Sequence, residues 1–312
     1  MLPSVDTNDE LNAMVADEAL LRPACQDLLD QLGLTGVPLI RFDDGSLPVY
    51  AVGEDMVLKL YPGFEAAESV REARVLHHLW GQLPVPTPRL IAADQYKNGW
   101  RYVLMSRLPG TSLAQAWPRI APLDRDRLIS QAGEVLAALH ELDHKPLGTT
   151  VGPPDWGRFL QRQREDAVRH HRSVGLAGPW LEQIPEFLDA VPLPVPDRSE
   201  LTLLHTEFMR EHLTVDPRDG FRMTGLFDFE PAMIGDPAYD FVSVGLYVSR
   251  GQPRLLRRFY QAYGREPYDP YQLMAHTLLH VYSDLPWYLR ELPPPPEPRL
   301  DALAETWFGT EG

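Results

Sequence analysis

Residues 201–240 read LTLLHTEFMREHLTVDPRDGFRMTGLFDFEPAMIGDPAYD, and most of what the sequence says about fold and function lies in this stretch. The apolar run 201–204 predicts a short strand. Two further apolar runs, 213–215 and 223–227, flank the turn sequence DPRDG. Turn residues between two apolar runs are typical of a β-hairpin. The stretch therefore predicts one strand followed by a hairpin.

Four polar residues stand at the ends of these predicted strands. His205 and Glu207 follow the first strand, His212 precedes the hairpin, and Asp228 follows it. The hairpin would bring Glu207, His212 and Asp228 to one end, where their side chains can converge on a metal ion or a phosphate. Phosphoryl-transfer enzymes need a carboxylate base and metal ligands at such a place.

Length and composition narrow the class of protein. The chain has 312 residues, 44% of them hydrophobic, and a mean hydropathy of -0.26, which fits a soluble globular protein of two compact lobes or one large domain. No apolar run approaches the roughly 18–20 residues that span a bilayer. Residues 1–10 contain no basic residue and so do not resemble a secretory signal. The single Cys25 excludes an internal disulfide and a multi-cysteine zinc site. We expect a cytoplasmic protein that does not bind membranes.

The net charge of -15 argues against a nucleic-acid-binding protein, which needs a basic surface. An acidic cleft would concentrate a cationic ligand near its mouth. An acidic surface that only improves solubility explains the same charge.

The first third of the chain predicts a nucleotide-binding lobe. A helix is expected over 16–32, two or three strands over 41–62, a helix over 66–80, and a hairpin formed by 90–94 and 100–105. Exposed loops and turns separate these elements.

Lys59 and Glu72 are the candidate phosphate-binding pair of this lobe. Lys59 alternates with Leu58 and Leu60 in a predicted strand, so it points to the opposite face from these leucines. Kinases use a strand lysine fixed by a helix glutamate to hold nucleotide phosphates. Glu72 lies on the following helix, and Glu68, one turn earlier, is the alternative partner. A lysine on a strand face is ordinarily only solvated, but the helix that follows, with Glu72 on it, favours the phosphate-binding role for Lys59.

The rest of the chain is mainly helical. Helices are expected over 124–142, within 153–190, and over 241–249, 255–263 and 271–285. Residues 293–298, PPPPEP, predict a stiff polyproline-type turn.

The order of these motifs resembles the aminoglycoside phosphotransferases, a family with a protein-kinase-like fold. Their catalytic loop reads roughly H-G-D-x-x-x-x-N and is followed by an Asp-Phe pair and a G-D-P-x-Y-D segment. This chain has His205, then Asp228-Phe229, then GDPAYD at 235–240. DEALLRPACQDLLDQLGL, VPTPRLI before VLMSRLPGT, and LLHVYSDLPW look most similar to the hygromycin-B kinase branch.

The resemblance implies an α+β fold with two lobes. A small antiparallel-sheet N-terminal lobe with one key helix would cover residues 1–107, with the leading helix 16–32. A larger, mainly helical C-terminal lobe would cover 108–312 and carry the catalytic loop and the acceptor site. Asp236 and Asp240 of the GDPAYD segment are expected to order the loop.

The resemblance also implies roles for single residues. Glu207 stands where the catalytic Asp is expected, and His205 would pin the loop. Asp228 and His212 would bind the metal, although His212 replaces the expected Asn. The adenine would pair with the backbone of a hinge, and the remaining nucleotide contacts would come from a turn over the phosphates. The residues assigned to these two segments are Met105, Ser106 and Leu108 for the hinge, and Gly45 and Ser46 for the turn. An ordinary hairpin turn is the alternative for the last pair.

The implied reaction is transfer of the γ-phosphate of ATP, or alternatively GTP, to a hydroxyl of a small molecule. Mg²⁺, or alternatively Mn²⁺, would assist. The acceptor would be a small, cationic, hydroxyl-bearing molecule such as an aminoglycoside antibiotic, which makes antibiotic resistance the expected role. Glu230, Asp284 and Glu291 are candidates to face it. We expect a monomer or a weak dimer.

Three alternatives stay open. The acceptor could be another natural product or a peptide hydroxyl. The chain could bind nucleotide without transferring phosphate, because Glu207 and His212 replace the expected Asp and Asn. His205, Glu207 and His212 could instead form a metal triad of the non-haem iron type. A zinc deaminase is excluded, since its P-C-x-x-C partner motif needs more than one cysteine.

Overall fold

The computed structural model describes residues 2–42 and 45–311, and the chain divides into two compact units. Unit 1 comprises residues 1–110 together with 224–231, and unit 2 comprises 111–223 together with 232–312. The predicted lobe boundary at residue 107 lies close to the end of the first segment. The prediction had placed 224–231 in the C-terminal lobe, whereas these residues make their contacts in unit 1.

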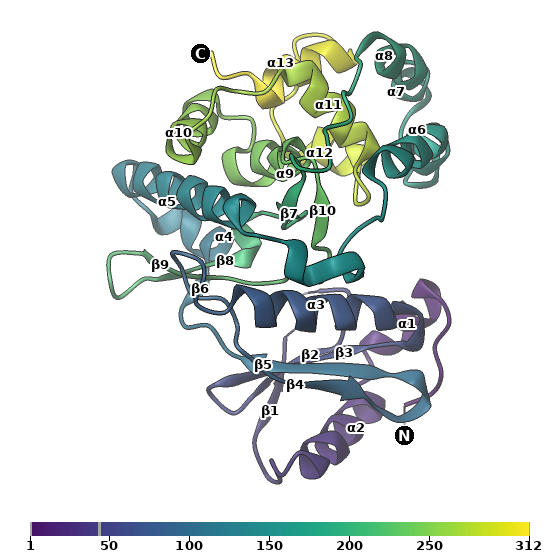
Figure 1. The fold of residues 1–312 in the computed structure, drawn as a ribbon, viewed down its shortest axis with the longest axis vertical. Coiled ribbons are helices and arrows are strands. Elements are labelled where there is room, and N and C mark those ends of the chain that lie inside the picture. The colour runs from purple at the N-terminus through teal and green to yellow at the C-terminus, as the bar shows by residue number, and fades with distance from the viewer. Residues whose placement is uncertain (1, 43–44, 312) are drawn as a thin grey trace. The chain divides into compact units, whose positions relative to one another are not determined.

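Unit 1 contains a five-stranded antiparallel sheet with the strand order β1-β2-β3-β5-β4 (Figure 1). Its strands are β1 (Leu39–Arg41), β2 (Val49–Val52), β3 (Met56–Tyr61), β4 (Leu90–Gln95) and β5 (Arg101–Ser106). The central strand β3 pairs with β5 over Met56–Tyr61 and with β2 over Met56–Lys59, so Lys59 lies between two neighbouring strands. The strands predicted in 41–62 and the hairpin of 90–94 with 100–105 are therefore present.

Three helices accompany this sheet: α1 (Asn8–Val15), α2 (Glu18–Gln31) and α3 (Ala66–Leu79). The sheet meets α2 through Tyr50, whose hydroxyl donates to Glu18 at 2.6 Å. Leu58 lies opposite Tyr50 in the register and is fully buried on the same face. Because side chains alternate between the two faces along β3, Lys59 lies on the other face, where it forms an ion pair with Glu72 of α3.

Unit 2 is mainly helical and has short strands. Its helices are α4 (Leu113–Ala116), α5 (Pro122–Glu141), α6 (Trp156–Ser173), α7 (Gly178–Leu181), α8 (Ile184–Ala190), α9 (Ala238–Ser243), α10 (Pro253–Tyr263), α11 (Pro270–Leu279), α12 (Leu285–Glu291) and α13 (Leu300–Phe308). Its strands are β6 (Thr111–Ser112), β7 (Thr202–Leu204), β8 (Leu213–Asp216), β9 (Arg222–Leu226) and β10 (Met233–Gly235). The sheets are β10-β7 and β6-β8-β9, and the last residues of β9 enter unit 1. This mixed architecture confirms the predicted α+β class.

In the core of unit 2, α5 packs on α10 (Figure 1). Aromatic rings from α9 and α10 also meet there. Phe241 stacks on Tyr260 with ring centroids 4.8 Å apart. The close approach of the two helices requires Gly133, because a Cβ there would lie 2.7 Å from the Phe259 carbonyl oxygen. The apolar patterns at 124–142 and 255–263 therefore become a helix pair that supports the segment around α9.

One predicted helix is wrong in its length. The pattern over 271–285 predicted a single helix, but α11 ends at Leu279 and α12 begins at Leu285. Pro286 cannot donate a backbone hydrogen bond to the preceding turn. Asp284 instead accepts from the N–H of Trp287 at 3.0 Å and caps a new helix. Within residues 2–42 and 45–311, no helix combines the length and the apolar character that membrane crossing requires.

Candidate active site

The most charged buried site of unit 1 surrounds Lys59. The Lys59 side chain is only 9% exposed, and its Nζ lies 2.5 Å from Glu230, 2.7 Å from Asp228 and 3.7 Å from Glu72. One ammonium group thus contacts three carboxylates, and we call these four residues the Lys59 cluster. Charges this deeply buried persist only when they are paired.

Three different segments build the cluster. Lys59 comes from β3, Glu72 from α3, and Asp228 and Glu230 from the segment after β9. The hydroxyl of Tyr61 donates to Glu72 and fixes that carboxylate. Glu68, the alternative partner, pairs with Arg71 at 3.8 Å. The Lys59–Glu72 pair predicted from spacing is therefore present.

Asp228 adopts a backbone conformation that most side chains avoid. Its φ is +72°, in the left-handed region, which costs a residue with a Cβ about 1–2 kcal/mol. The neighbouring segment is anchored by Arg71, whose Nη1 donates to the Glu230 carbonyl at 2.9 Å. Strain of this kind concentrates at functional sites, where surrounding contacts maintain it.

Burial and mutual repulsion change how the acidic groups titrate. Burial disfavours the Lys59 ammonium, but Asp228, Glu230 and Glu72 outweigh it and hold the lysine pKa well above its usual range. Burial also raises the pKa of Glu72 to about 7, with Lys59 opposing and the other two carboxylates adding to the rise. The pKa of Glu65, also raised to about 7 by burial and by Glu230, shows the same surplus of negative charge.

This arrangement suits a phosphate with its metal ion. An ammonium can contact phosphate oxygens, and carboxylate oxygens are what Mg²⁺ and Mn²⁺ accept from proteins. Among residues 2–42 and 45–311, no three His, Cys, Asp or Glu side chains are grouped so that they could hold a metal by themselves. Asp228 and Glu230, both within 2.7 Å of the Lys59 ammonium, are the residues whose oxygens could contribute to such a metal.

The other predicted nucleotide residues lie at the sheet. Gly45 and Ser46 form an exposed turn between β1 and β2; Gly45 has a φ of +111° and open space where a Cβ would be. In the predicted hinge, the Ser106 N–H already bonds to the Arg89 carbonyl at 2.9 Å. Adenine recognition would therefore use other backbone groups of Met105–Leu108, and both assignments stay predictions.

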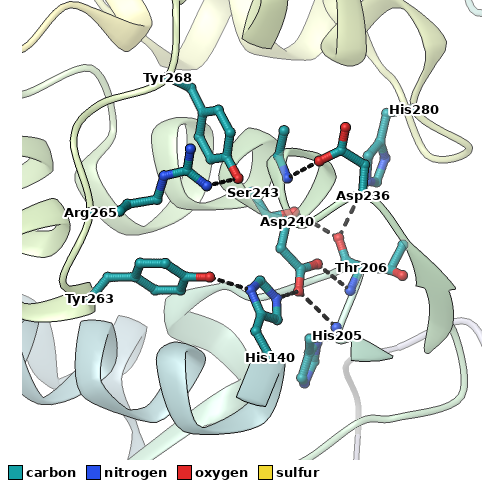
Figure 2. Close-up of polar contacts among 11 residues, drawn as sticks. His140, His205, Thr206, Asp236, Asp240, Ser243, Tyr263, Arg265, Tyr268 and His280 are labelled. Atoms are coloured by element: carbon teal, nitrogen blue, oxygen red, sulfur yellow. Dashed lines mark hydrogen bonds and ion pairs between the residues drawn. The ribbon is translucent and has the colours of Figure 1, made fainter. Parts of the chain in front are cut away.

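The second candidate element, in unit 2, is the loop of His205, Thr206 and Glu207 that follows β7. The buried carboxylate of Asp240 accepts the N–H of His205 at 2.8 Å and the N–H of Thr206 at 2.6 Å (Figure 2). His140 lies on the same carboxylate, with Nε2 3.0 Å from it. Asp240 therefore fixes the loop through its backbone, as the ordering role predicted for it requires.

Thr206 is held from its other side as well. Its carbonyl accepts from the Ser243 hydroxyl at 2.8 Å and lies 3.3 Å from Nε2 of His280 (Figure 2). Its φ is +74°, although a β-branched residue strongly disfavours this region. The loop conformation is thus set by tertiary contacts, since the local sequence opposes it.

The two substituted positions, Glu207 and His212, are linked directly. Nδ1 of His212 lies 2.9 Å from the backbone carbonyl oxygen of Glu207. The His212 ring also stacks on His205, with centroids 5.7 Å apart and an interplanar angle of 30°. Within residues 2–42 and 45–311, no three His, Cys, Asp or Glu side chains are grouped so that they could hold a metal ion. The alternative of a His205, Glu207 and His212 metal triad is therefore wrong.

The comparison with protein families decides the identity of the chain. The model of the phosphotransferase enzyme family matches residues 39–274. The chain belongs to this family. The predicted family membership is thereby confirmed.

Solved structures show that this phosphotransferase shares the fold of antibiotic kinases. The GDP and kanamycin complex of the aminoglycoside phosphotransferase APH(2″)-IIIa matches with a TM-score of 0.69 and 17% identity, covering 83% of this chain and 87% of that one. A thermostable mutant of APH(4)-Ia, in ternary complex with AMP-PNP and hygromycin B, matches with a TM-score of 0.64 and 18% identity, covering 92% and 99%. A macrolide 2'-phosphotransferase from Brachybacterium faecium has a TM-score of 0.59 and 21% identity, covering 86% and 91%. The kinase-like fold predicted for the phosphotransferase is confirmed.

A curated relative covers only part of the phosphotransferase. Acyl-CoA dehydrogenase family member 11 from Gallus gallus is 28% identical over 162 residues, which is 50% of this chain. The chain spans about a fifth of the length of that relative, 20% of it being aligned.

The three acidic residues predicted to face an acceptor lie in different surroundings. Glu230 belongs to the Lys59 cluster in unit 1, and its contact with an acceptor stays a prediction. Asp284 caps α12, and Glu291 lies 3.6 Å from Arg250. Their proposed contact with an acceptor stays a prediction.

Sequence reasoning missed an aromatic pair in unit 2. Tyr247 stacks on Trp287, with centroids 5.6 Å apart and an interplanar angle of 24°. Burial raises the pKa of the Tyr247 phenol, and the Glu207 and Glu211 carboxylates add to the rise, so these charges lie within electrostatic range of it. The two residues are far apart in sequence, and an aromatic residue in a helix pattern ordinarily indicates core, so no local signal would have found the pair.

Proposed function

We propose that this phosphotransferase transfers the γ-phosphoryl group of ATP to a hydroxyl of a small, cationic, sugar-like molecule. The observation that carries the proposal is the Lys59 cluster: a buried ammonium fixed by Glu72 and placed 2.7 Å from Asp228. Kinases need this combination of a fixed lysine and a metal-binding carboxylate. GTP is the alternative donor, since one structural relative is a GDP complex.

Each residue of unit 1 has a role in binding the donor. The Lys59 ammonium would contact the phosphate oxygens, and Glu72 would keep it oriented. Asp228, with Glu230 beside it, would hold a divalent ion, which when bound neutralises charge on the phosphates. The cluster sets three carboxylates against one ammonium, and this ratio would favour binding of a divalent ion.

The loop of unit 2 would act on the acceptor. The Glu207 carboxylate would accept the proton of the attacking hydroxyl as the oxygen bonds to the γ-phosphorus and the bond to the leaving ADP oxygen breaks. The backbone N–H of His205 donates to Asp240, so His205 would position the loop. A general base in such a position contributes about 10²–10⁴-fold to the rate.

The surroundings of Glu207 support a sugar-like, cationic acceptor. The stacked Tyr247 and Trp287 offer aromatic surface on which a sugar ring can pack. Glu207 and Glu211 supply negative charge to the same neighbourhood, and the chain as a whole carries a net charge of -15. Amino groups on an acceptor would be attracted to both.

A different hydroxyl acceptor is the second candidate. The structural relatives include a macrolide phosphotransferase beside the aminoglycoside enzymes. One fold therefore accommodates acceptors of different chemistry. The acceptor panel in the experiment below separates the two candidates.

The test is ADP release measured with ATP, a divalent metal and a panel of aminoglycosides and macrolides. We expect one acceptor class to accelerate release, and Glu207→Gln to lower kcat by about 10²–10⁴-fold. Glu211→Gln is the comparison variant: it removes a nearby exposed carboxylate, so it should raise KM for a cationic acceptor but leave kcat within about twofold. Equal kcat values for the parent and Glu207→Gln would eliminate Glu207 as the base. No acceleration by any acceptor would contradict the proposed acceptor classes.

A further inference from the structure

Arg210 is a buried charged residue that the proposed chemistry does not use. It begins a short 3₁₀ turn, Arg210–His212, on the loop that carries the proposed base Glu207. The residue is only 4% exposed. In the H-G-D-x-x-x-x-N pattern it occupies one of the four variable positions, so the pattern assigns it no role. Taking a charge out of water is costly, so its contacts must compensate for that cost.

Two kinds of contact hold the guanidinium of Arg210. Nε and Nη2 donate to the carbonyl oxygen of Val248, at 2.8 and 2.5 Å. The same group lies over the Trp117 ring, with Cζ 3.5 Å from the ring centroid. A guanidinium suits both contacts, because it donates in a fixed planar fork and stacks on aromatic faces. Burial lowers the pKa of Arg210 to about 9, with Arg250 adding to the fall and Glu211 opposing it, so the side chain stays charged at neutral pH.

The Val248 carbonyl lies near the end of an unusual helix. Residues Val244–Ser249 form a π-helix, and Arg250 after it has a φ of +53°. The last carbonyl groups of a helix have no N–H partner within the helix, and they favour a positive charge. Arg210 supplies both the N–H donors and the charge. Single π-helical turns occur frequently at functional sites.

The same helix carries one ring of the aromatic pair of unit 2. Tyr247 directly precedes Val248 and stacks on Trp287, with centroids 5.6 Å apart, and both rings are half-buried. A movement of the Val248 backbone would therefore move the Tyr247 ring. On the other side, Arg210 follows Glu207 by three positions. One side chain thus connects the loop of the proposed base with the helix that carries the aromatic surface.

We propose that Arg210 is a positioning residue that fixes the base-bearing loop relative to the Tyr247–Trp287 pair and so controls how well the acceptor binds and reacts. The inference rests on the proposed function, in which Glu207 is the base and the aromatic pair contacts the acceptor. All of these residues belong to unit 2. In this role Arg210 acts through its neighbours and need not touch the reacting atoms.

A role in stability alone gives different expectations. Loss of the bonds to Val248 would then lower the unfolding temperature, while the folded enzyme would keep its kcat and its KM for the acceptor. A positioning role changes the kinetics of the folded enzyme, because a displacement of about 1 Å can cost on the order of 10²-fold in rate. The experiment must therefore report on geometry and kinetics as well as on stability.

The first measurement is ¹⁹F NMR of the full chain labelled with 5-fluorotryptophan, in which Trp287→Phe identifies the Trp287 resonance. Arg210→Lys keeps the charge but loses the forked donation to Val248, so we expect it to shift the Trp287 resonance. Arg257→Lys is the matched control, since Nε and Nη2 of Arg257 also donate to one carbonyl oxygen, that of Thr310. It should leave the Trp287 resonance unchanged.

Thermal unfolding shows whether each variant is folded. Should Arg210→Lys fail to fold, Trp117→Phe is the second variant, because it reduces the aromatic surface under the guanidinium while Arg210 can still donate to Val248. It should also shift the Trp287 resonance. A Trp287 resonance at the parent position in the folded variant would overturn the proposal.

The second measurement is ADP release with ATP, a divalent metal and whichever aminoglycoside or macrolide accelerates it. We expect Arg210→Lys to raise KM for that acceptor and to lower kcat/KM by about 10–100-fold. The AMP-PNP dissociation constant should not change, because the Lys59 cluster lies in unit 1. Parent kcat and KM in Arg210→Lys would overturn the proposal. If no acceptor accelerates ADP release, the proposed acceptor classes fail, whereas a shifted Trp287 resonance still supports the positioning of the aromatic pair by Arg210.

Discussion

The two units use buried charge in opposite ways. In unit 1, one buried ammonium meets three carboxylates, so the Lys59 cluster carries more negative than positive charge. In unit 2, the buried carboxylate of Asp240 is occupied by two backbone N–H groups and His140, and nearby histidines are buried. The ion pairs of the Lys59 cluster are ones that a bound ligand could replace. The charge of Asp240 instead holds the backbone of the loop in place.

This difference has a chemical reason. A donor site must exchange its internal ion pairs for contacts to phosphate and metal, so incomplete neutralisation favours binding of a cation. A loop that presents a base must keep one geometry through the reaction. Asp240 gives that geometry by bonding the chain at His205 and Thr206, directly before Glu207.

The largest effect is expected when the loop support in unit 2 is removed. Asp240→Ala leaves two buried N–H groups without their acceptor, and breaking such a buried network costs about 3–5 kcal/mol. Asp236→Ala, in the same GDPAYD segment, removes one local bond to the N–H of Ala238 and should cost about 1 kcal/mol. Urea unfolding measures both. Equal costs for the two variants would show that Asp240 has no special role.

Acid should weaken unit 2 through its buried histidines. Burial lowers the pKa of His276 to about 3, and those of His171 and His280 to about 4. Below the unfolded pKa of about 6.5 the unfolded chain binds more protons than the folded one, so stability falls as the pH falls. From pH 7 to pH 5, the free energy of unfolding of His276→Gln should fall by about 2 kcal/mol less than that of the parent.

Urea unfolding at the two pH values measures this loss. His77→Gln, on the exposed side of α3, is the matched control and should leave the pH dependence of stability unchanged. An unchanged slope in His276→Gln would contradict the assignment of acid sensitivity to this residue.

Glu72 should give the opposite response in unit 1. Its folded pKa of about 7 lies above the usual value of 4.5, so the folded chain binds more protons between these limits. Stability without nucleotide is therefore lost as the pH rises through this window. Glu72→Gln has no ionisable group at this position. Between pH 5 and pH 7 its free energy of unfolding should therefore fall by about 2 kcal/mol less than that of the parent. A parent and a variant with parallel pH curves would contradict the raised pKa.

The sequence predicted the parts of the site that depend on local periodicity. Alternation in β3 placed Lys59 opposite Leu58, and helical spacing placed Glu72 in reach of it. The hairpin signal around the DPRDG turn predicted β8 and β9. In each case neighbouring residues carried the information, because alternation and turn chemistry are local properties.

Tertiary contacts determined the rest. Nothing near Glu230 in sequence indicates that its carboxylate lies 2.5 Å from Lys59, 171 positions away by residue number, and it was therefore predicted at the acceptor. Thr206 would be expected to avoid a φ of +74°, and its contacts with Asp240, Ser243 and His280 hold it there. The break between α11 and α12 followed from Pro286 and Asp284, which were visible in the sequence but were outweighed by the apolar pattern.

Calorimetric titration of AMP-PNP with a divalent ion into the parent and Lys59→Met tests the central claim most directly. We expect the parent to bind AMP-PNP with a dissociation constant within about 1 μM–1 mM, the usual range for enzyme substrates. Lys59→Met should bind at least about tenfold more weakly, since it loses a charge-assisted contact to phosphate. Equal affinity in the two proteins, with both folded by circular dichroism, would contradict the assignment of the Lys59 cluster to nucleotide binding.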